Sequence, residues 1–500
     1  MISRRTLLGA GAATLGLTTL GVTRAPALTS TQWSSLASRL TGTLVLPTDS
    51  TYATAKQIEL MQFDSINPQA IAYCATPADV SLCLGFAQQN GVSISVRSGG
   101  HSLGGYSLGR GLVVDVSRMN SVSISGGSVQ VGAGAENVDV LDALAPSGLA
   151  LVGGACPTVG AGGFVQGGGL GFLSRSYGMA CDQLTAVQLV TASGRQLTAS
   201  ATQNTDLFWA LRGGGGGNFG VVTGYTFAPA QLSMVSINNL VFDPANTVDM
   251  LDGFQNWLVD APWTIGGAAV VALNDAAAGN PVSPTVLLVS TGTATELAAE
   301  VTRLLTYTGA AVAQNPATMP YQALMTNIYG CASLTELQCH LVTAPSGQLP
   351  RTAYARERSR LFSGPVSRDM WSAALSVFDK DRMTGQTHEL QVISMGGAVG
   401  DLARTDTAFV HRDSLFTTVF SGVVQGSSAS TTAAGTAQAW VDAGFNAIDP
   451  YSNGETYQNF IDPELSGWRS AYYAENYSRL ASIKQSYDPN GVFRFAQSIL

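Results

Sequence analysis

The spacing of apolar residues along the first half of the chain predicts alternating helices and strands. Behind a proline, residues 77–87 carry apolar side chains at helical spacing. Residues 92–96 alternate between apolar and polar side chains, and 112–116 form a second short apolar run, as strands do. Helical spacing returns over 138–144. Short strands, helices and glycine turns alternate in this way over residues 66–230, which is typical of an α+β fold.

The pattern changes in the second half of the chain. Residues 285–289 predict a strand and 297–305 an amphipathic helix, and glycines there occur at most in pairs. From Tyr451 the sequence is polar, aromatic and helical in spacing up to Tyr487. We therefore divide the chain into a first domain over 66–230, a second domain over 231–450 and a C-terminal segment over 451–500.

The N-terminal residues have the pattern of an export signal. Ser3-Arg4-Arg5-Thr6-Leu7-Leu8-Gly9 is a twin-arginine sequence, and Ala25-Pro26-Ala27 offers a small-x-small cleavage site. A membrane anchor is the alternative, but Thr18, Thr19 and several glycines make the stretch between them short and weakly apolar for a span. We expect residues 1–27 to be a twin-arginine signal peptide and the protein to be secreted.

Composition and charge exclude some partners. The chain has 500 residues, 45% hydrophobic and 12% charged, with a formal net charge of −8. The predicted signal segment holds three arginines and no acidic residue, so the remainder is more acidic still. An acidic chain of this kind argues against nucleic acid and anionic membranes as partners.

The six cysteines leave several pairings open. Cys74 and Cys83 lie nine residues apart and Cys331 and Cys339 eight apart, so either pair could close a local loop. Cys156 and Cys181 are then left over. Six buried thiols are the alternative, and spacing alone does not decide between them.

Three glycine-rich runs carry the candidate chemistry: 97–107, 153–171 and 213–220. His101 lies in the first run and Cys156 in the second, where glycine lets the backbone approach a ligand closely. The dinucleotide fingerprint G-x-G-x-x-G with a following acidic residue is not convincingly present, which disfavours a Rossmann site. A flexible linker at 213–217 is disfavoured by its apolar flanks.

Four ordered motifs resemble one known family. They are Arg97-Ser-Gly-Gly-His101, Cys156-Pro-Thr-Val159-Gly160, the run from Leu207 through Trp209 to Gly220, and the tail from Asn476 to Ser498. Together they resemble the berberine-bridge-enzyme-like branch of the vanillyl-alcohol-oxidase flavoproteins, densely at both ends and thinly over 231–385. The resemblance implies a two-subdomain FAD-binding domain plus an α/β substrate domain with an antiparallel sheet flanked by helices. Exported bacterial members include carbohydrate oxidases and oxidases that tailor glycosylated antibiotics.

The resemblance also implies how the cofactor is held. His101 matches the histidine that bonds the flavin 8α-methyl carbon, and Cys156 matches the cysteine that bonds flavin C6 through sulfur. Val159 falls where the family has an oxygen gatekeeper, and a small β-branched side chain there is associated with dioxygen as the acceptor. The other positions that the resemblance places at FAD are Arg97, Ser98, Gly99, Gly100, Ser102, Gly160, Gly163, Gly167, Gly168, Asn218, Gly220, Val222, Tyr473 and Asn476.

The catalytic base is expected in the tail or on a strand across the cleft. Tyr472 matches a family tyrosine that faces the flavin, and as a base it would have to be stabilised as phenolate. Gln391, and less clearly Glu389, match substrate-facing positions on the strand 388–397. Met395 departs from the tyrosine that many relatives carry before the paired glycines, which weakens a two-tyrosine mechanism.

These observations predict a secreted, monomeric FAD-dependent oxidase. It would oxidise an alcohol or hemiacetal of a sugar or glycosylated metabolite and reduce O2 to H2O2. Three alternatives remain open: a dehydrogenase with another acceptor, an oxidative C–C or C–N ring-forming enzyme that uses a carboxylate such as Glu389, and a flavinylated binding protein. Trp371, Trp440 and Tyr451 are candidate sugar platforms. No metal is expected, because His340 and His411 have no metal-like spacing.

Overall fold

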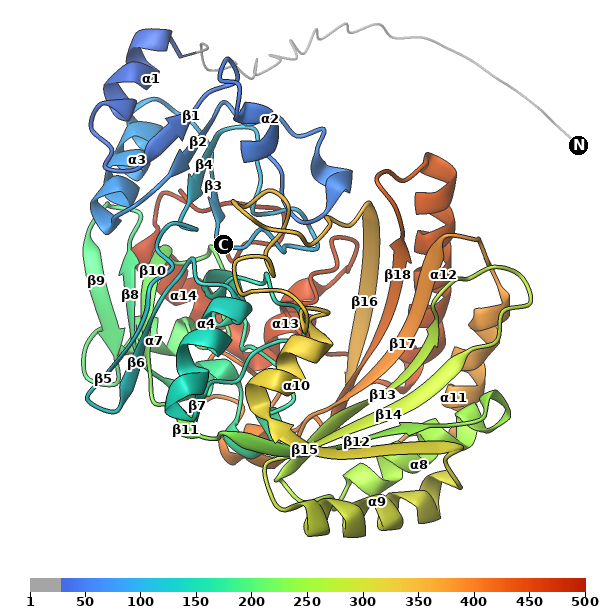
Figure 1. Ribbon diagram of the computed structural model, residues 1–500. Coiled ribbons are helices and arrows are strands. Elements are labelled where there is room, and N and C mark those ends of the chain that lie inside the picture. Colours follow the sequence, from blue (N-terminus) through green and yellow to red (C-terminus); the bar gives the residue numbers. More distant parts are fainter. Residues whose placement is uncertain (1–27) are drawn as a thin grey trace, which may run out of the picture.

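The computed structural model describes residues 28–500, so the predicted signal segment 1–27 lies outside the described residues. One part of the structure contains two small sheets, and the other is built on a single large sheet (Figure 1). Within residues 28–500, no helix is long and apolar enough to span a membrane.

The first small sheet has four strands in the order β1 (Thr43–Val45), β2 (Ala70–Tyr73), β4 (Leu112–Asp115) and β3 (Ile94–Arg97). β2 and β3 run parallel to β4, whereas β1 is antiparallel to β2. Helices α1 (Ser30–Ala37) and α3 (Pro77–Gln89) lie beside this sheet. At the start of α3 the Thr76 and Asp79 side chains form a capping box.

The second small sheet is antiparallel, in the order β5 (Val122–Ser125), β6 (Ser128–Gly132), β10 (Val221–Phe227), β8 (Leu184–Val190) and β9 (Gln196–Ser200). Helix α4 (Asn137–Leu144) follows β6, and α7 (Thr205–Ala210) precedes β10. A two-stranded ribbon pairs β11 (Ala230–Gln231) with β7 (Leu149–Ala150). Of two one-turn helices, α5 (Ala161–Phe164) lies within the second glycine-rich run, and α6 (Ser174–Tyr177) follows it.

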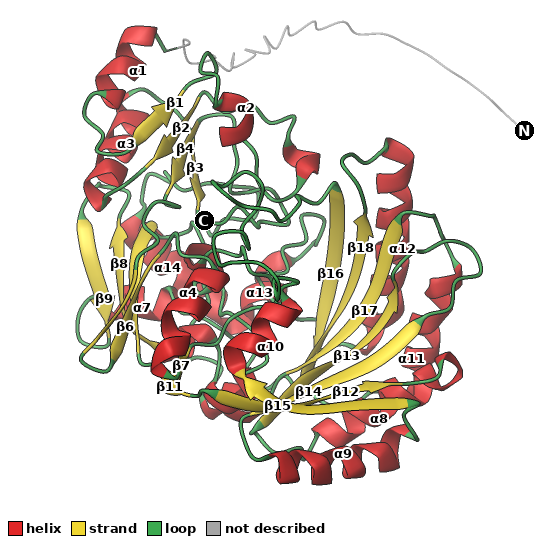
Figure 2. Cartoon of the chain, viewed as in Figure 1, coloured by secondary structure: helices red, strands yellow, loops and turns green. Residues whose placement is uncertain are grey.

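The large sheet has seven antiparallel strands. Their order is β15 (Ala313–Pro320), β12 (Met234–Val241), β14 (Ser283–Ser290), β13 (Ile265–Leu273), β17 (Gln386–Ser394), β18 (Phe416–Val424) and β16 (Tyr354–Phe362). Helices α8 (Thr247–Leu258), α9 (Ala294–Thr308), α11 (Arg368–Leu375) and α12 (Thr431–Ile448) cover its outer face (Figure 2). Along β17 the alternate residues from Gln386 to Ser394 are buried, so the intervening residues face the opposite side of the sheet.

The remaining helices connect these parts. α2 (Tyr52–Ala55) precedes the first sheet, and α10 (Tyr321–Ile328) follows β15 and packs against α4. α13 (Trp468–Tyr473) and α14 (Tyr477–Tyr487) form the C-terminal segment, and α14 packs on α7 of the first half of the chain. Ile499 completes this return, because its N–H donates to Asn218 Oδ1 at 3.0 Å.

The elements confirm the α+β fold class and most of the predicted helices and strands. The sequence-based first domain began at residue 66, but residues 28–65 also belong to that half of the structure: β1 pairs with β2, and Trp33 is buried in its core. Of the two candidate disulfides, Cys331–Cys339 is formed. The Sγ atoms of Cys74 and Cys83 lie 3.9 Å apart as buried, unbonded thiols.

Arg175 joins the two halves of the molecule. Its buried guanidinium donates hydrogen bonds to three backbone carbonyls: Ala261 at 2.7 Å, Ile265 at 2.8 Å and Met395 at 2.5 Å. Burial without a carboxylate partner lowers the pKa of this guanidinium to about 10. The contact fixes the large sheet relative to the glycine-rich loops.

Candidate active site

A cavity of about 910 Å³ lies between the glycine-rich loops and the inner face of the large sheet. Three chain regions form its walls: the loops of the first half, the strands β13, β16, β17 and β18, and the C-terminal segment. Most of the residues that the sequence singled out meet here. They are Ser98, Gly99, Gly100, His101, Ser102, Cys156, Val159, Gly160, Gly163, Asn218, Val222, Glu389, Gln391, Tyr472 and Tyr473.

The first glycine loop leaves β3 and presents free backbone donors. The amides of Gly99, Gly100, His101 and Ser102 donate no hydrogen bond within the described residues. Such a run of N–H groups is suited to an anionic group. Gly99 also approaches the next loop so closely that a Cβ there would lie 2.4 Å from the Gly160 nitrogen.

The His101 imidazole is neutral in this wall. Its Nε2 lies 2.6 Å from Thr158 Oγ1, and burial lowers the pKa of the imidazole to about 4. A neutral imidazole has the unprotonated nitrogen that bond formation to an electrophilic carbon requires.

Helix α4 positions the segment that carries Cys156. Asn137 Nδ2 donates to the Cys156 carbonyl at 2.9 Å, and the Asn137 and Val138 amides donate to the Val159 and Pro157 carbonyls. The thiol faces the cavity and is exposed to it. Desolvation by the surrounding protein, and to a smaller extent the nearby carboxylates, Glu357 first, raise the pKa of this thiol to about 12.

The cavity fits a flavin dinucleotide in its chemistry as well as in its volume. Ser107 Oγ, Gln166 Oε1 and Gln497 Oε1 are buried in its wall without a hydrogen-bond partner among the described residues. Buried polar atoms of this kind call for a ligand or water. Beside them, a Cβ built on Gly163 would meet nothing within 4 Å, so this backbone borders open space. A large polar cofactor with amide-like edges would satisfy these groups.

Five of the residues expected at FAD do not line the cavity but hold its loops. Arg97 is buried in an ion pair with Asp115 and donates to the Ala55 carbonyl at 2.8 Å. Asn476 Nδ2 donates to the Arg404 and Thr407 carbonyls. The other three are glycines packed against protein atoms: Gly167 on Asn459, Gly168 on Phe409 and Gly220 on Val190.

Tyr472 lies in the wall formed by the C-terminal segment. Its hydroxyl accepts a hydrogen bond from the Asp462 N–H at 2.9 Å. Burial nevertheless raises the pKa of this phenol well above its usual value. The neighbouring Tyr473 hydroxyl is committed elsewhere, because it donates to the Gly214 carbonyl at 3.1 Å.

The opposite wall, on the large sheet, is acidic. Gln391 Nε2 donates to Glu389 Oε2 at 2.8 Å, and both side chains face the cavity from β17. Glu357 on β16 and Glu59 near α2 join them, and sequence reasoning missed both. Desolvation, together with Glu389 and Glu59, raises the pKa of Glu357 to about 7. Burial also raises the pKa of Glu59.

Several other candidates face away from the cavity. His388 is fully buried on the other side of β17 and stacks on Trp440 at a ring distance of 4.2 Å. Trp371 and Trp440 are buried in the outer layer, and Tyr451 lies on the surface, so none of the three forms a sugar platform in the cavity. The aromatic residues of the cavity wall are instead Tyr106, Phe164, Phe172, Tyr457, Phe460, Tyr472, Tyr473, Phe493 and Phe495.

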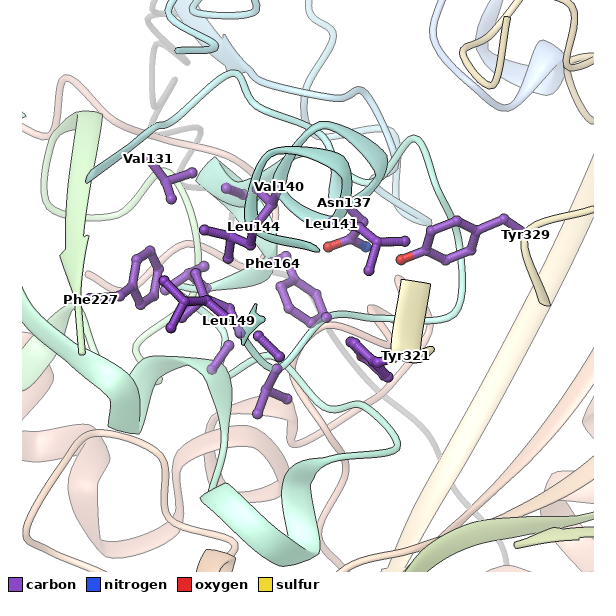
Figure 3. Close-up of a pocket in the computed structure, with 17 residues that line it drawn as sticks. Val131, Asn137, Val140, Leu141, Leu144, Leu149, Phe164, Phe227, Tyr321 and Tyr329 are labelled. Carbon is purple, nitrogen blue, oxygen red and sulfur yellow. The ribbon is translucent and has the colours of Figure 1, made fainter. Parts of the chain in front are cut away.

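A second hollow, of about 40 Å³, lies under α4 (Figure 3). Its lining is mostly apolar and includes Leu141 and Leu144 of α4 together with Phe164 and Tyr321. It is a packing gap beneath the Cys156 segment, and it carries no group arranged for chemistry.

Comparisons with known proteins agree with this site. The FAD binding domain family matches residues 68–200, and the Berberine and berberine like family matches residues 456–500. The fold and the cavity thus define an FAD-linked oxidoreductase. The chain belongs to the berberine-bridge-enzyme-like branch of the vanillyl-alcohol-oxidase family.

Individual relatives align over nearly the whole chain. The uncharacterized FAD-linked oxidoreductase YvdP of Bacillus subtilis is 30% identical, over 92% of this chain and 98% of the relative. Chitooligosaccharide oxidase of Gibberella zeae is also 30% identical, over 86% of this chain and 87% of the relative. Among solved structures, BBE-like 1 of Physcomitrella patens superimposes with a TM-score of 0.82 at 28% identity, over 93% of this chain and 98% of that one.

Proposed function

We propose that this protein is an oxidase that removes a hydride from an alcohol or hemiacetal carbon of a sugar or glycosylated metabolite and passes the electrons to O2. The observation that carries the proposal is the cavity, in which the two candidate flavin anchors face a polar wall of Gln391, Glu389 and Glu357. The similarity to chitooligosaccharide oxidase supports a carbohydrate substrate. Bound FAD would supply the hydride-accepting ring nitrogen.

In this proposal Tyr472 takes the proton from the substrate hydroxyl. The Asp462 N–H already donates to its oxygen, and this contact stabilises the phenolate. Burial, however, raises the pKa of Tyr472. Little phenolate therefore forms at neutral pH, and this opposes the role of Tyr472 as the base. Gln391 would orient the substrate by hydrogen bonding from the facing strand.

A peroxide assay over mono- and oligosaccharides tests the reaction class. We expect H2O2 to form with a subset of saccharides, and Tyr472→Phe to lower kcat on them by at least 100-fold. Gln391→Ala should mainly raise KM. Unchanged turnover of every accepted saccharide by Tyr472→Phe would end the tyrosine mechanism.

We also propose that FAD is attached twice, through His101 and Cys156. Both side chains face one cavity, and the neutral imidazole is ready to bond carbon. Denatured wild-type protein should stay yellow. Each single variant, His101→Ala or Cys156→Ala, should retain flavin covalently, and only the double variant should release all of it. Release of flavin from the denatured wild type would contradict the proposal.

The choice of O2 as acceptor rests on Val159, which lines the cavity three residues after Cys156. We expect Val159→Leu to slow O2 consumption at least tenfold while dye reduction continues. If Val159→Leu slowed O2 consumption and dye reduction equally, Val159 would have only a packing role.

A second candidate, oxidative C–C or C–N bond formation, is favoured by the acidic wall. Glu389 or Glu357 could serve there as a carboxylate base. In that case Glu389→Gln would abolish turnover of a cyclisable amine substrate, and Tyr472→Phe would leave it unchanged.

We further propose that the protein is exported as a monomer through the twin-arginine route. Replacing Arg4 and Arg5 by lysine should keep it inside the cell, and light scattering of the secreted protein should give the mass of one chain. Export unchanged by the double replacement would contradict this route.

A further inference from the structure

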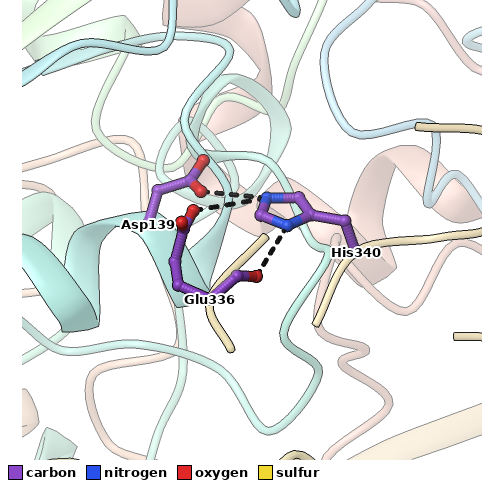
Figure 4. Close-up of side chains that lie close together, drawn as sticks. All are labelled: Asp139, Glu336 and His340. Atoms are coloured by element: carbon purple, nitrogen blue, oxygen red, sulfur yellow. Dashed lines mark hydrogen bonds and ion pairs between the residues drawn. The ribbon is translucent and has the colours of Figure 1, made fainter. Parts of the chain in front are cut away.

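A cluster of ionisable side chains lies outside the cavity, where the second half of the chain meets α4. Glu336 comes from the loop that the Cys331–Cys339 disulfide closes, His340 directly follows that loop, and Asp139 comes from the first turn of α4 (Figure 4). Glu136 is the residue before α4. His340 Nε2 lies 2.9 Å from Asp139 Oδ1, 3.6 Å from Glu136 Oε2 and 3.9 Å from Glu336 Oε1. One nitrogen thus faces three carboxylate oxygens.

The imidazole is oriented so that Nε2 points into the cluster. Its Nδ1 lies 2.9 Å from the Glu336 carbonyl oxygen, and since a carbonyl can only accept, Nδ1 carries the proton. A histidine that binds a metal usually donates its other ring N–H to a carbonyl or carboxylate in this way. Asp139 is fixed similarly, because its second oxygen accepts from the Glu136 N–H at 2.7 Å.

Glu136 adds an unsatisfied carboxylate oxygen beside this group. Its Oε2 is buried and has no hydrogen-bond partner among the described residues, although it lies 3.6 Å from His340 Nε2. A buried carboxylate oxygen without a partner is costly. A proton on Nε2 would be shared among three carboxylates and balance one of their negative charges.

His411 shows what a satisfied histidine looks like in the same chain. Its Nδ1 lies 2.7 Å from Glu455 Oε2 and its Nε2 lies 3.1 Å from Gln458 Oε1, so each ring nitrogen has one partner. His340 also has one hydrogen-bond partner on each nitrogen, but two further carboxylate oxygens, of Glu136 and Glu336, lie within 4 Å of its Nε2.

The distances suit a first-row divalent cation. Zinc binds nitrogen and carboxylate oxygen at about 2.0–2.2 Å, which separates neighbouring ligand atoms of a tetrahedron by about 3.4 Å. His340 Nε2 lies 2.9 Å from Asp139 Oδ1 and 3.9 Å from Glu336 Oε1, and these two separations bracket that value. The imidazole ligand disfavours Mg²⁺ and Ca²⁺, which prefer oxygen.

We propose that His340, Asp139 and Glu336, whose ligand atoms all lie within 4.8 Å of one another, form a structural binding site for a divalent transition-metal ion of the Zn²⁺ type. The ion would tie the disulfide-closed loop to the first turn of α4, whose amides hold the segment that carries Cys156. Tyr329 makes a parallel contact, since its hydroxyl donates to the Gly154 carbonyl at 3.3 Å. The site therefore braces the cofactor wall from outside and takes no part in the reaction.

Zinc titration of the flavin-loaded full chain, produced without a histidine tag and stripped with chelator, tests the proposal. Competition with a chromophoric chelator should give one Zn²⁺ per chain. His340→Gln should weaken binding at least 100-fold and Glu336→Gln at least tenfold. Asp142→Asn is the matched control on α4, because its carboxylate faces Gln322 at 2.9 Å, and it should bind as the wild type does.

Cobalt gives a second readout that does not depend on stability. Co²⁺ in the wild type should show the visible absorption of a four-coordinate ion, beyond the flavin bands, and Glu336→Gln should lose it. Zn²⁺ should also raise the Tm of the wild type and not that of Glu336→Gln. The proposal is overturned if the wild type binds no zinc, or if wild type and both variants bind it equally.

Discussion

The buried carboxylate of Glu357 in the acidic wall of the cavity lowers the free energy of unfolding at neutral pH. Glu357 keeps its proton up to a pH of about 7 in the folded chain, because its carboxylate is desolvated beside two other acids. In the unfolded chain it would ionise near pH 4. The folded state therefore binds the proton more tightly, and the free energy of unfolding falls as the pH rises between these values.

Glu357→Gln should remove this dependence. We expect the variant to be more stable than the wild type by about 1–3 kcal/mol at pH 8 and equally stable at pH 4. Urea unfolding at the two pH values measures the difference. Asp401→Asn, at an exposed carboxylate, is the control and should change stability little at either pH. A variant less stable than the wild type at pH 8 would contradict the explanation.

Gly99 is required for contact between two loops. A Cβ at this position would lie 2.4 Å from the Gly160 nitrogen and 2.6 Å from the Thr158 oxygen, both backbone atoms. Gly99→Ala should therefore destabilise the protein by about 2–4 kcal/mol and lower its flavin content. Gly85→Ala on α3, where a Cβ meets nothing within 4 Å, should be neutral or stabilise by up to about 1 kcal/mol. Thermal melts with flavin absorbance distinguish the two.

At the scale of elements, the Cys331–Cys339 disulfide closes the short loop 331–339. Replacing both cysteines by serine should cost about 2–3 kcal/mol, as expected for a short closed loop. A reductant should lower the Tm of the wild type toward that of the double variant. The variant itself should not respond to reductant, because Cys74 and Cys83 are unbonded. A response would indicate that this second pair also forms a disulfide.

The local pattern of apolar and polar residues could predict those strands along which buried and exposed side chains alternate. β17 alternates over its whole length, so Glu389 and Gln391 could be assigned to one face before the structure was known. Side chains also alternate on β16, but charged residues occupy both faces. Arg356, Arg358 and Arg360 turn outward and pair with carboxylates of the α12 layer and the C-terminal segment. Glu357 therefore faces the cavity.

Contacts between distant segments could not be predicted in this way. Residues 136–139 and 336–340 are separated by about 200 positions, so no spacing rule connects His340 with Asp139. Glu59 lies before the first recognisable motif, and only the fold brings it to the acidic wall. Family motifs located the glycine loops, but they could not separate residues that line the cavity from those, such as Arg97 and Asn476, that hold its loops.

For the whole molecule, we expect the three hydrogen bonds of Arg175 to contribute most to the free energy that couples the two halves. Arg175→Met would leave three carbonyls without their donor, so we expect a loss of about 3 kcal/mol and a broadened urea transition. Arg110→Met, on the surface, should stay within about 0.5 kcal/mol of the wild type. A sharp transition with unchanged midpoint in Arg175→Met would show that the halves are joined elsewhere.

The return of residues 493–499 to the first half of the chain fixes the order of events in biosynthesis. Phe493, Phe495 and Gln497 complete the cavity wall, and Lys484 Nζ bridges the Asn218 and Phe493 carbonyls. The cavity wall is therefore still incomplete when only residues 28–450 have been synthesised. We expect flavin to be captured only after residues 493–497 have been synthesised, and a chain truncated after Gly491 to contain less flavin than the wild type.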